Sequence, residues 1–138
     1  MEKFEVVDIS GDVGIRAYGE SLEDVFANTA MGMYSLITDP EGIGEIKEIG
    51  TAAGSHSLDG LLVSWLNELI FHFDAYGFVG RRIMIEKLEN RRILAKVSGE
   101  DFDPERHERR LLIKAATYHQ LSVEKKEGRW TAHVIFDI

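Results

Sequence analysis

The last five residues of the chain, "VIFDI" at 134–138, place two negative groups side by side in a segment that has the pattern of a strand. Trp130, Ala132, Val134 and Phe136 alternate with Thr131, His133, Ile135 and Asp137, as is typical of a strand with one buried face. Because this pattern continues to the last residue, we expect the side chain of Asp137 and the terminal carboxylate of Ile138 to be held in fixed positions. Two fixed carboxylates on adjacent residues repel each other, and the fold must either tolerate that repulsion or use it.

Alternation predicts that two more charged residues lie on the same sheet face as Asp137. Segments 13–18 and 111–119 both have period-2 patterns, which send Asp12 and Lys114 away from the core. The residues predicted to face the core are Val13, Ile15, Ala17, Leu111, Ile113 and Ala115. Ala116 and Tyr118 are predicted to lie on the outer face with Lys114.

If these residues converge, they form a site made of oxygen ligands. The side chains of Asp12 and Asp137 and the terminal carboxylate of Ile138 suit a hard divalent cation, and Lys114 supplies a compact positive charge that balances or contacts a phosphate. The strand register does not follow from the sequence. Scattered surface charges are therefore the alternative interpretation.

Other motifs in the chain are incomplete. The segment "PEGIGEIKEIG" lacks the third glycine of a dinucleotide loop and the Gly-Lys-Ser/Thr of a phosphate loop. In "GSHS" no glycine follows the first serine, so a nucleophile elbow is excluded and Ser57 is interpreted as a helix N-cap. Glu68 and His72 are spaced as a metal pair on one helix face, but an ordinary exposed pair is the simpler interpretation.

Composition predicts one soluble domain. The 138 residues are 44% hydrophobic, hold no cysteine and carry a net charge of −8, which argues against nucleic-acid binding through a broad basic surface. No apolar run is long enough to span a membrane, and the first ten residues lack the layout of a signal peptide. We therefore expect a cytoplasmic protein with a single domain over 1–138.

Periodicity predicts an α+β fold. Two helices are expected, from the capping box "SLED" at 21–24 to Asp39-Pro40 and from Ser57 to Gly77. Strands are expected at 13–18, on both sides of a turn at Glu89-Asn90, at 111–119, at 121–126 and at 129–138, with a poorly patterned strand near 45–50. The expected architecture is two helices packed on one face of a mostly antiparallel sheet.

Several of these motifs together resemble the archease family. The matching segments are "GDVGI" (11–15), "SLEDVFANTA" (21–30), "LLVSWLNELI" (61–70), "IKAATYH" (113–119) and the terminal "DI", with His107 shortly before the fourth. The resemblance implies a small α+β protein with a strand–helix–strand–strand core and inserted elements. It also implies a protein that assists the GTP-dependent RNA ligase of tRNA splicing by promoting its guanylylation and multiple turnover.

The resemblance assigns roles to the residues at the matching positions. It implies a metal site formed by Asp12, Asp137 and the carboxylate of Ile138, and a functionally required Lys114. The expected metal is calcium, with magnesium or manganese as alternatives. One departure concerns residues 9–11, where Ile-Ser-Gly replaces the His-Thr-Ala that is usual in the family.

We therefore expect a non-enzymatic activator whose partner is the tRNA-splicing ligase, with no sequence-specific contact to nucleic acid and no membrane contact. A stand-alone metal-dependent phosphohydrolase is one alternative, because the same cluster would activate water. A generic chaperone or adaptor is the other.

Overall fold

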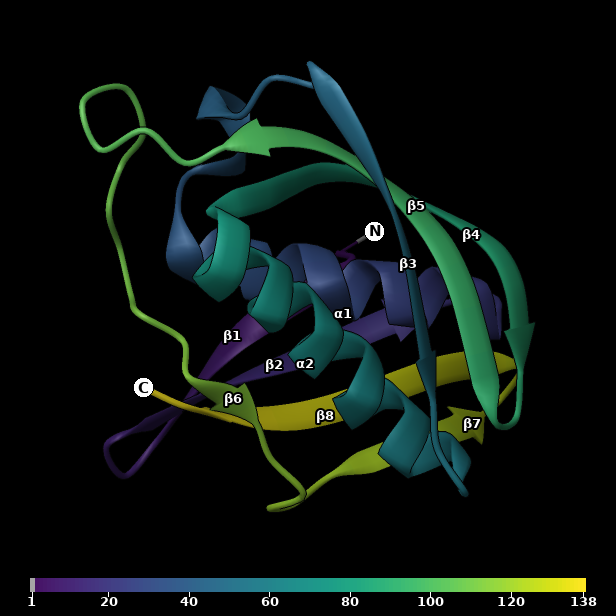
Figure 1. Cartoon of the computed structure of the whole chain (residues 1–138). Helices are drawn as coiled ribbons and strands as arrows, with labels where there is room; N and C mark the ends of the chain where they lie inside the picture. Colours follow the sequence, from purple (N-terminus) through teal and green to yellow (C-terminus); the bar gives the residue numbers. More distant parts are fainter. Residues whose placement is uncertain (1) are drawn as a thin grey trace.

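The protein consists of two antiparallel sheets with two helices between them (Figure 1). The structure is a computed structural model that describes residues 2–138. The elements in chain order are β1 (Phe4–Ile9), β2 (Asp12–Gly19), α1 (Leu22–Ile37), a 3₁₀ turn (Pro40–Gly42), β3 (Lys47–Gly54), α2 (Leu58–Tyr76), β4 (Phe78–Glu89), β5 (Arg92–Asp101), β6 (Ala115–Ala116), β7 (Ser122–Lys126) and β8 (Arg129–Asp137). None of the helices within residues 2–138 is both long and apolar enough to cross a membrane.

The first sheet has the order β1-β2-β8-β6, with β7 also paired to β8, and the second has the order β3-β5-β4. Both helices contact strands of both sheets. The α+β class and the antiparallel pairing are thus confirmed. The strands are divided between two sheets that enclose the helices, whereas the sequence pattern had indicated a single covered sheet.

The central pair β2–β8 follows the predicted alternation except at Ile135, which was predicted on the outer face and is buried. The side chains that face the helices are fully or almost fully buried: Val13, Ile15, Ala17, Ala132, Val134 and Phe136. These residues join both helices and the second sheet in one hydrophobic cluster.

Both helices begin and end as the sequence predicts. The hydroxyl of Ser21 accepts a hydrogen bond from the amide of Asp24 at the start of α1, and that of Ser57 accepts one from Gly60 at the start of α2. Gly77 ends α2 in the left-handed region at φ 73°, where a residue without Cβ is favoured. The second hairpin also forms, with its turn at 90–91, one residue later than the predicted turn.

Strand β1 was not predicted from the sequence. It pairs with β2 through a two-residue turn in which Ser10 and Gly11 both have positive φ, 38° and 91°. This turn belongs to the class that matches the twist of a β-hairpin. The departure from the family's usual His-Thr-Ala falls on this turn and on Ile9 at the end of β1, directly before Asp12.

The strand predicted over 111–119 is wrong except at Ala115 and Ala116. The amides of Arg110 and Leu111 instead donate to the carbonyls of Ile37 and Leu36, at 3.0 and 2.9 Å. The last carbonyls of a helix lack partners within the helix, so this segment supplies the donors that α1 needs at its C-terminal end.

Candidate functional site

Asp12 and Asp137 lie at neighbouring positions at one end of the first sheet. Val13 is paired with Phe136 in the β2–β8 ladder, and the antiparallel register therefore places Asp12 directly beside Asp137. Directly opposite residues share a sheet face, with Cβ atoms about 4.5–5.5 Å apart. Both side chains are exposed, on the face opposite to Val13 and Phe136.

The donor set of this pair fits a hard cation. Within residues 2–138, neither aspartate forms an ion pair, so two carboxylates on opposite strand positions remain without a compensating charge. No group of three or more His, Cys, Asp or Glu side chains that could hold a metal occurs in that range. A metal here would therefore depend on a further oxygen donor, and the residue adjacent to Asp137 is Ile138.

Lys114 lies on the other side of β8 from Asp12. Its backbone amide donates to the carbonyl of Asp137 at 2.8 Å, and its side chain is exposed. The predicted alternation of this segment is wrong, because Leu111 is 38% exposed whereas Ala116 is buried. The β6–β8 register places Ala115 beside Asp137. The backbone of Lys114 is thus bonded to Asp137, but the residue directly opposite Asp137 on β6 is Ala115.

Asn67 of α2 holds the segment that contains Lys114. Its side-chain oxygen accepts a hydrogen bond from the amide of Ala116 at 2.8 Å, and its side-chain amide donates to the carbonyl of Ala116 at 3.3 Å. On the other edge, the amide of Thr117 donates to the carbonyl of Ile135. Sequence reasoning missed Asn67, although a polar residue within the apolar run "LLVSWLNELI" is a signal of a buried hydrogen bond.

A second buried cluster was also missed, and it surrounds His107. Glu100 is 2% exposed and His107 is 5% exposed, and His107 Nε2 lies 3.3 Å from Glu100 Oε2. The amide of Gly44 and then the guanidinium of Arg106 hold the pKa of Glu100 below its usual range, against the opposing effect of burial. Because His107 Nδ1 accepts a hydrogen bond from the amide of Asp103, the cluster joins the end of β5 to the loops at Gly44 and at 103–107 and has a structural role.

The other candidates from the sequence have ordinary structural roles. Glu68 and His72 form a partly exposed pair at 3.6 Å on α2. The glycine-rich segment after α1 contains the 3₁₀ turn, and its Gly44 amide donates to Glu100. Neither has the geometry of a metal or phosphate site.

Comparison with known proteins gives one consistent result. The model of the archease protein family matches residues 4–138. An archease of Methanosarcina mazei is 37% identical over 141 residues, covering 99% of this chain and 97% of that protein. An archease of Pyrococcus furiosus is 36% identical, with 100% of both chains covered.

Two solved structures have the same fold. Protein 1598 of Methanobacterium thermoautotrophicum superposes with a TM-score of 0.80 at 30% identity, covering 100% of both chains. An archease of Thermotoga maritima, described as a possible chaperone, superposes with a TM-score of 0.67 at 19% identity, covering 96% of this chain and 94% of that one.

Proposed function

The chain belongs to the archease family, and on that premise we propose that it is a non-enzymatic activator of a GTP-dependent tRNA-splicing RNA ligase. It would act in the cytoplasm by promoting guanylylation and multiple turnover of that ligase. The observation that carries the proposal is the paired position of Asp12 and Asp137 at a sheet end, with the amide of Lys114 bound to the carbonyl of Asp137.

In this proposal Asp12, Asp137 and the terminal carboxylate of Ile138 hold one divalent cation. All are oxygen donors, which favours Ca²⁺, with Mg²⁺ or Mn²⁺ as alternatives. The bound ion would supply a positive charge at the surface that contacts the ligase. The two aspartates fix its position because they project from neighbouring strands, and β2 and β8 are anchored by the buried core.

Lys114 has a separate role in the proposal. Its backbone is fixed by the hydrogen bond to the carbonyl of Asp137 and by the hydrogen bonds between Asn67 and the nearby Ala116. Its side chain is exposed. An ammonium on a flexible stem is a compact charge that reaches the anionic groups of a nucleotide or of a partner's active site. The backbone contacts thus position this charge without neutralising it.

The exposure of these residues supports action on a partner protein. Sites that transform a small substrate enclose most of its surface. Asp12, Asp137 and Lys114 are instead exposed at the end of a sheet, where another protein surface has access to them. The description of the Thermotoga maritima relative as a possible chaperone agrees with a role in assisting another protein.

The test is ligation of tRNA halves by the partner ligase at limiting enzyme, in GTP and a divalent metal, with and without this protein. We expect many turnovers per ligase only when the protein is present. Lys114→Ala should abolish the stimulation while the melting temperature stays nearly unchanged, because the side chain is exposed. Lys125→Ala is the matched control, since Lys125 is an exposed lysine of β7 and should be replaceable without effect.

Two results would overturn the proposal. The first is stimulation by Lys114→Ala equal to that of the unmodified protein. The second is metal-dependent hydrolysis of GTP or phosphate esters by the purified protein, lost in Asp12→Ala, which would establish a phosphohydrolase.

A further inference from the structure

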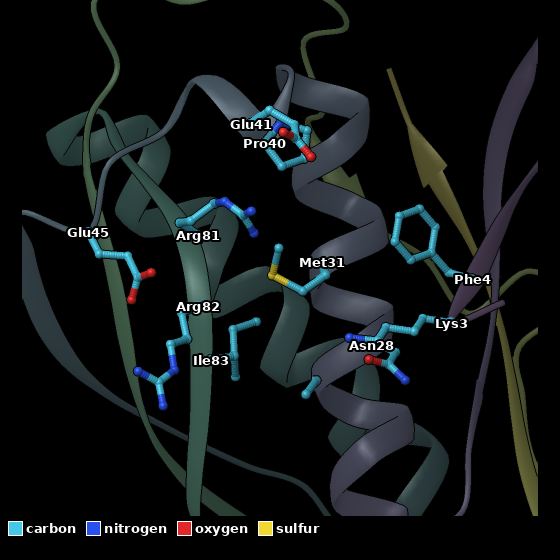
Figure 2. A pocket seen from close by; sticks show the side chains of 11 residues that line it. Lys3, Phe4, Asn28, Met31, Pro40, Glu41, Glu45, Arg81, Arg82 and Ile83 are labelled. Atoms are coloured by element: carbon cyan, nitrogen blue, oxygen red, sulfur yellow. The ribbon is translucent and has the colours of Figure 1, made fainter. Parts of the chain in front are cut away.

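A cavity of about 520 Å³ lies between α1 and the first half of β4, far from the aspartate pair. Residues 3–4 and the segment from Pro40 to Glu45 form its other walls (Figure 2). Phe4 is paired with Ala17 on β2, five residues from Asp12, so the cavity is roughly 17 Å along the strand from that pair. It is therefore a different site from the one described above.

Three cations line this cavity without a partner. Within residues 2–138, no carboxylate comes within salt-bridge distance of Lys3, Arg81 or Arg82. Elsewhere on the first sheet, by contrast, Arg16 is paired with Glu5 at 3.0 Å. In a chain whose net charge is −8, these three cations outnumber the two carboxylates of the lining, Glu41 and Glu45, and the cavity is a favourable place for an anion.

The backbone of β4 directs one of these cations inward. The β4–β5 register shifts between Gly80 and Arg82, and the bulge leaves Arg81 without a partner on β5. A Cβ on Gly80 would lie 2.5 Å from the Val97 side chain of β5 and 2.7 Å from the Tyr34 ring of α1, so a larger residue there would require these side chains to shift. Bulges redirect side chains, and Figure 2 shows Arg81 extending from β4 toward Met31 of α1.

The rest of the lining suits a flat ring. Phe4, Met31 and Ile83 are half-buried and pack against the core, and they give the cavity an apolar floor. The carboxylates of Glu41 and Glu45 also line it, and both are without an ion pair among the described residues. They offer acceptors for amino groups on such a ring.

We propose that this cavity binds a small phosphorylated molecule of the nucleoside-phosphate class. The phosphate would lie between Arg81 and Lys3, where guanidinium and ammonium donors approach it from opposite walls. The base would lie against Phe4 and Met31, because a planar ring stacks on aromatic and apolar side chains. The volume is within the range of pockets that enclose small ligands.

The experiment is a titration of the full-length protein with AMP, followed by calorimetry and by amide chemical shifts. AMP should give saturable binding, with shifts at Met31, Arg81 and Ile83. Adenosine and inorganic phosphate should each bind about tenfold or more weakly than AMP, because each lacks one half of the contacts.

Arg81→Gln should weaken AMP binding about ten- to hundredfold, as expected for loss of a charge-assisted hydrogen bond. Its melting temperature should stay close to that of the unmodified protein, since Arg81 takes part in no ion pair within residues 2–138. Arg91→Gln removes the same charge from the exposed turn before β5 and should leave AMP affinity unchanged.

The proposal is overturned if AMP gives no saturable signal at millimolar concentration, or if Arg81→Gln binds it as well as the unmodified protein does. If adenosine bound as tightly as AMP, the cations would have no role in binding. If inorganic phosphate bound as tightly as AMP, the apolar floor would have none. None of these results bears on the proposed ligase activation, which is assigned to other residues.

Discussion

Replacing Asn67 tests whether α2 holds the segment that contains Lys114. Ala116 lies on the edge strand β6, and its amide and carbonyl are bonded to Asn67 of α2. Ala116 is only 5% exposed, so water has little access to these two groups. Asn67→Ala removes both hydrogen bonds at once.

The expected loss of stability follows from these contacts. Two neutral hydrogen bonds contribute about 2 kcal/mol, and the better helix propensity of alanine offsets about 0.6 kcal/mol, which leaves about 1.4 kcal/mol. The unfolding entropy of the 138-residue chain is about 0.29 kcal/mol/K, at about 2.1 cal/mol/K per residue. Asn67→Ala should therefore lower the melting temperature by about 5 °C.

Thermal unfolding followed by circular dichroism measures this shift, and amide hydrogen exchange of Ala116 reports the local effect. Exchange should accelerate because the Ala116 amide is bonded to Asn67 instead of β8. Ser64→Ala is the control, since Ser64 lies on α2 one turn before Asn67 and its side chain makes no hydrogen bond within residues 2–138. An unchanged melting temperature together with unchanged exchange at Ala116 would refute the reasoning.

Three further predictions concern charged groups. Asp12→Asn relieves repulsion with Asp137, so in the presence of a chelator the variant should be more stable than the unmodified protein by about 0.5 kcal/mol. Ca²⁺ should raise the melting temperature of the unmodified protein and leave that of the variant unchanged. An equal effect of Ca²⁺ on both proteins would contradict the metal assignment. Adding one glycine after Ile138 replaces its carboxylate with a neutral carbonyl, so calorimetry should record weaker Ca²⁺ binding than for the unmodified protein. The stability without metal should be unchanged. Equal Ca²⁺ affinity would show that Ile138 is not a ligand. Glu100→Gln should lower the melting temperature at neutral pH. The lowered pKa of Glu100 means that its stabilisation is present above the pKa of the unfolded chain and is lost as pH falls through the folded pKa, so the gap between the two proteins should close in acid, and parallel curves would argue against this.

Local patterns were sufficient for the parts of the fold that depend on local chemistry. The N-caps Ser21 and Ser57 and the C-terminal Gly77 follow from residue type and spacing, and the buried face of β8 follows from alternation. These features depend on neighbours within a few residues, so the sequence determines them without knowledge of the fold.

Segment 111–119 shows why the remainder could not be predicted. Its alternation is that of a strand, but the amides of Arg110 and Leu111 bond to the end of a helix that is distant in sequence. A short pattern carries no information about such partners. Similarly, parity placed Asp12 and Asp137 on one face, whereas their adjacency depends on the β2–β8 register, which the pattern leaves open.

The cap that segment 108–111 forms on α1 has a consequence for how the segment with Lys114 is attached to the fold. Arg110 Nη1 donates to the carbonyl of Ser35 across 75 residues, and the hydroxyl of Thr38 donates to the carbonyl of Glu108 across 70 residues. Each contact joins residues that are far apart in the chain, so the loop between them is closed at an entropic cost. Lys114 follows this cap by three residues, and the next contacts along the segment are those of Lys114 with β8 and of Ala116 with Asn67 of α2. The segment that carries the exposed lysine is thus bonded to both helices, although the lysine belongs to neither.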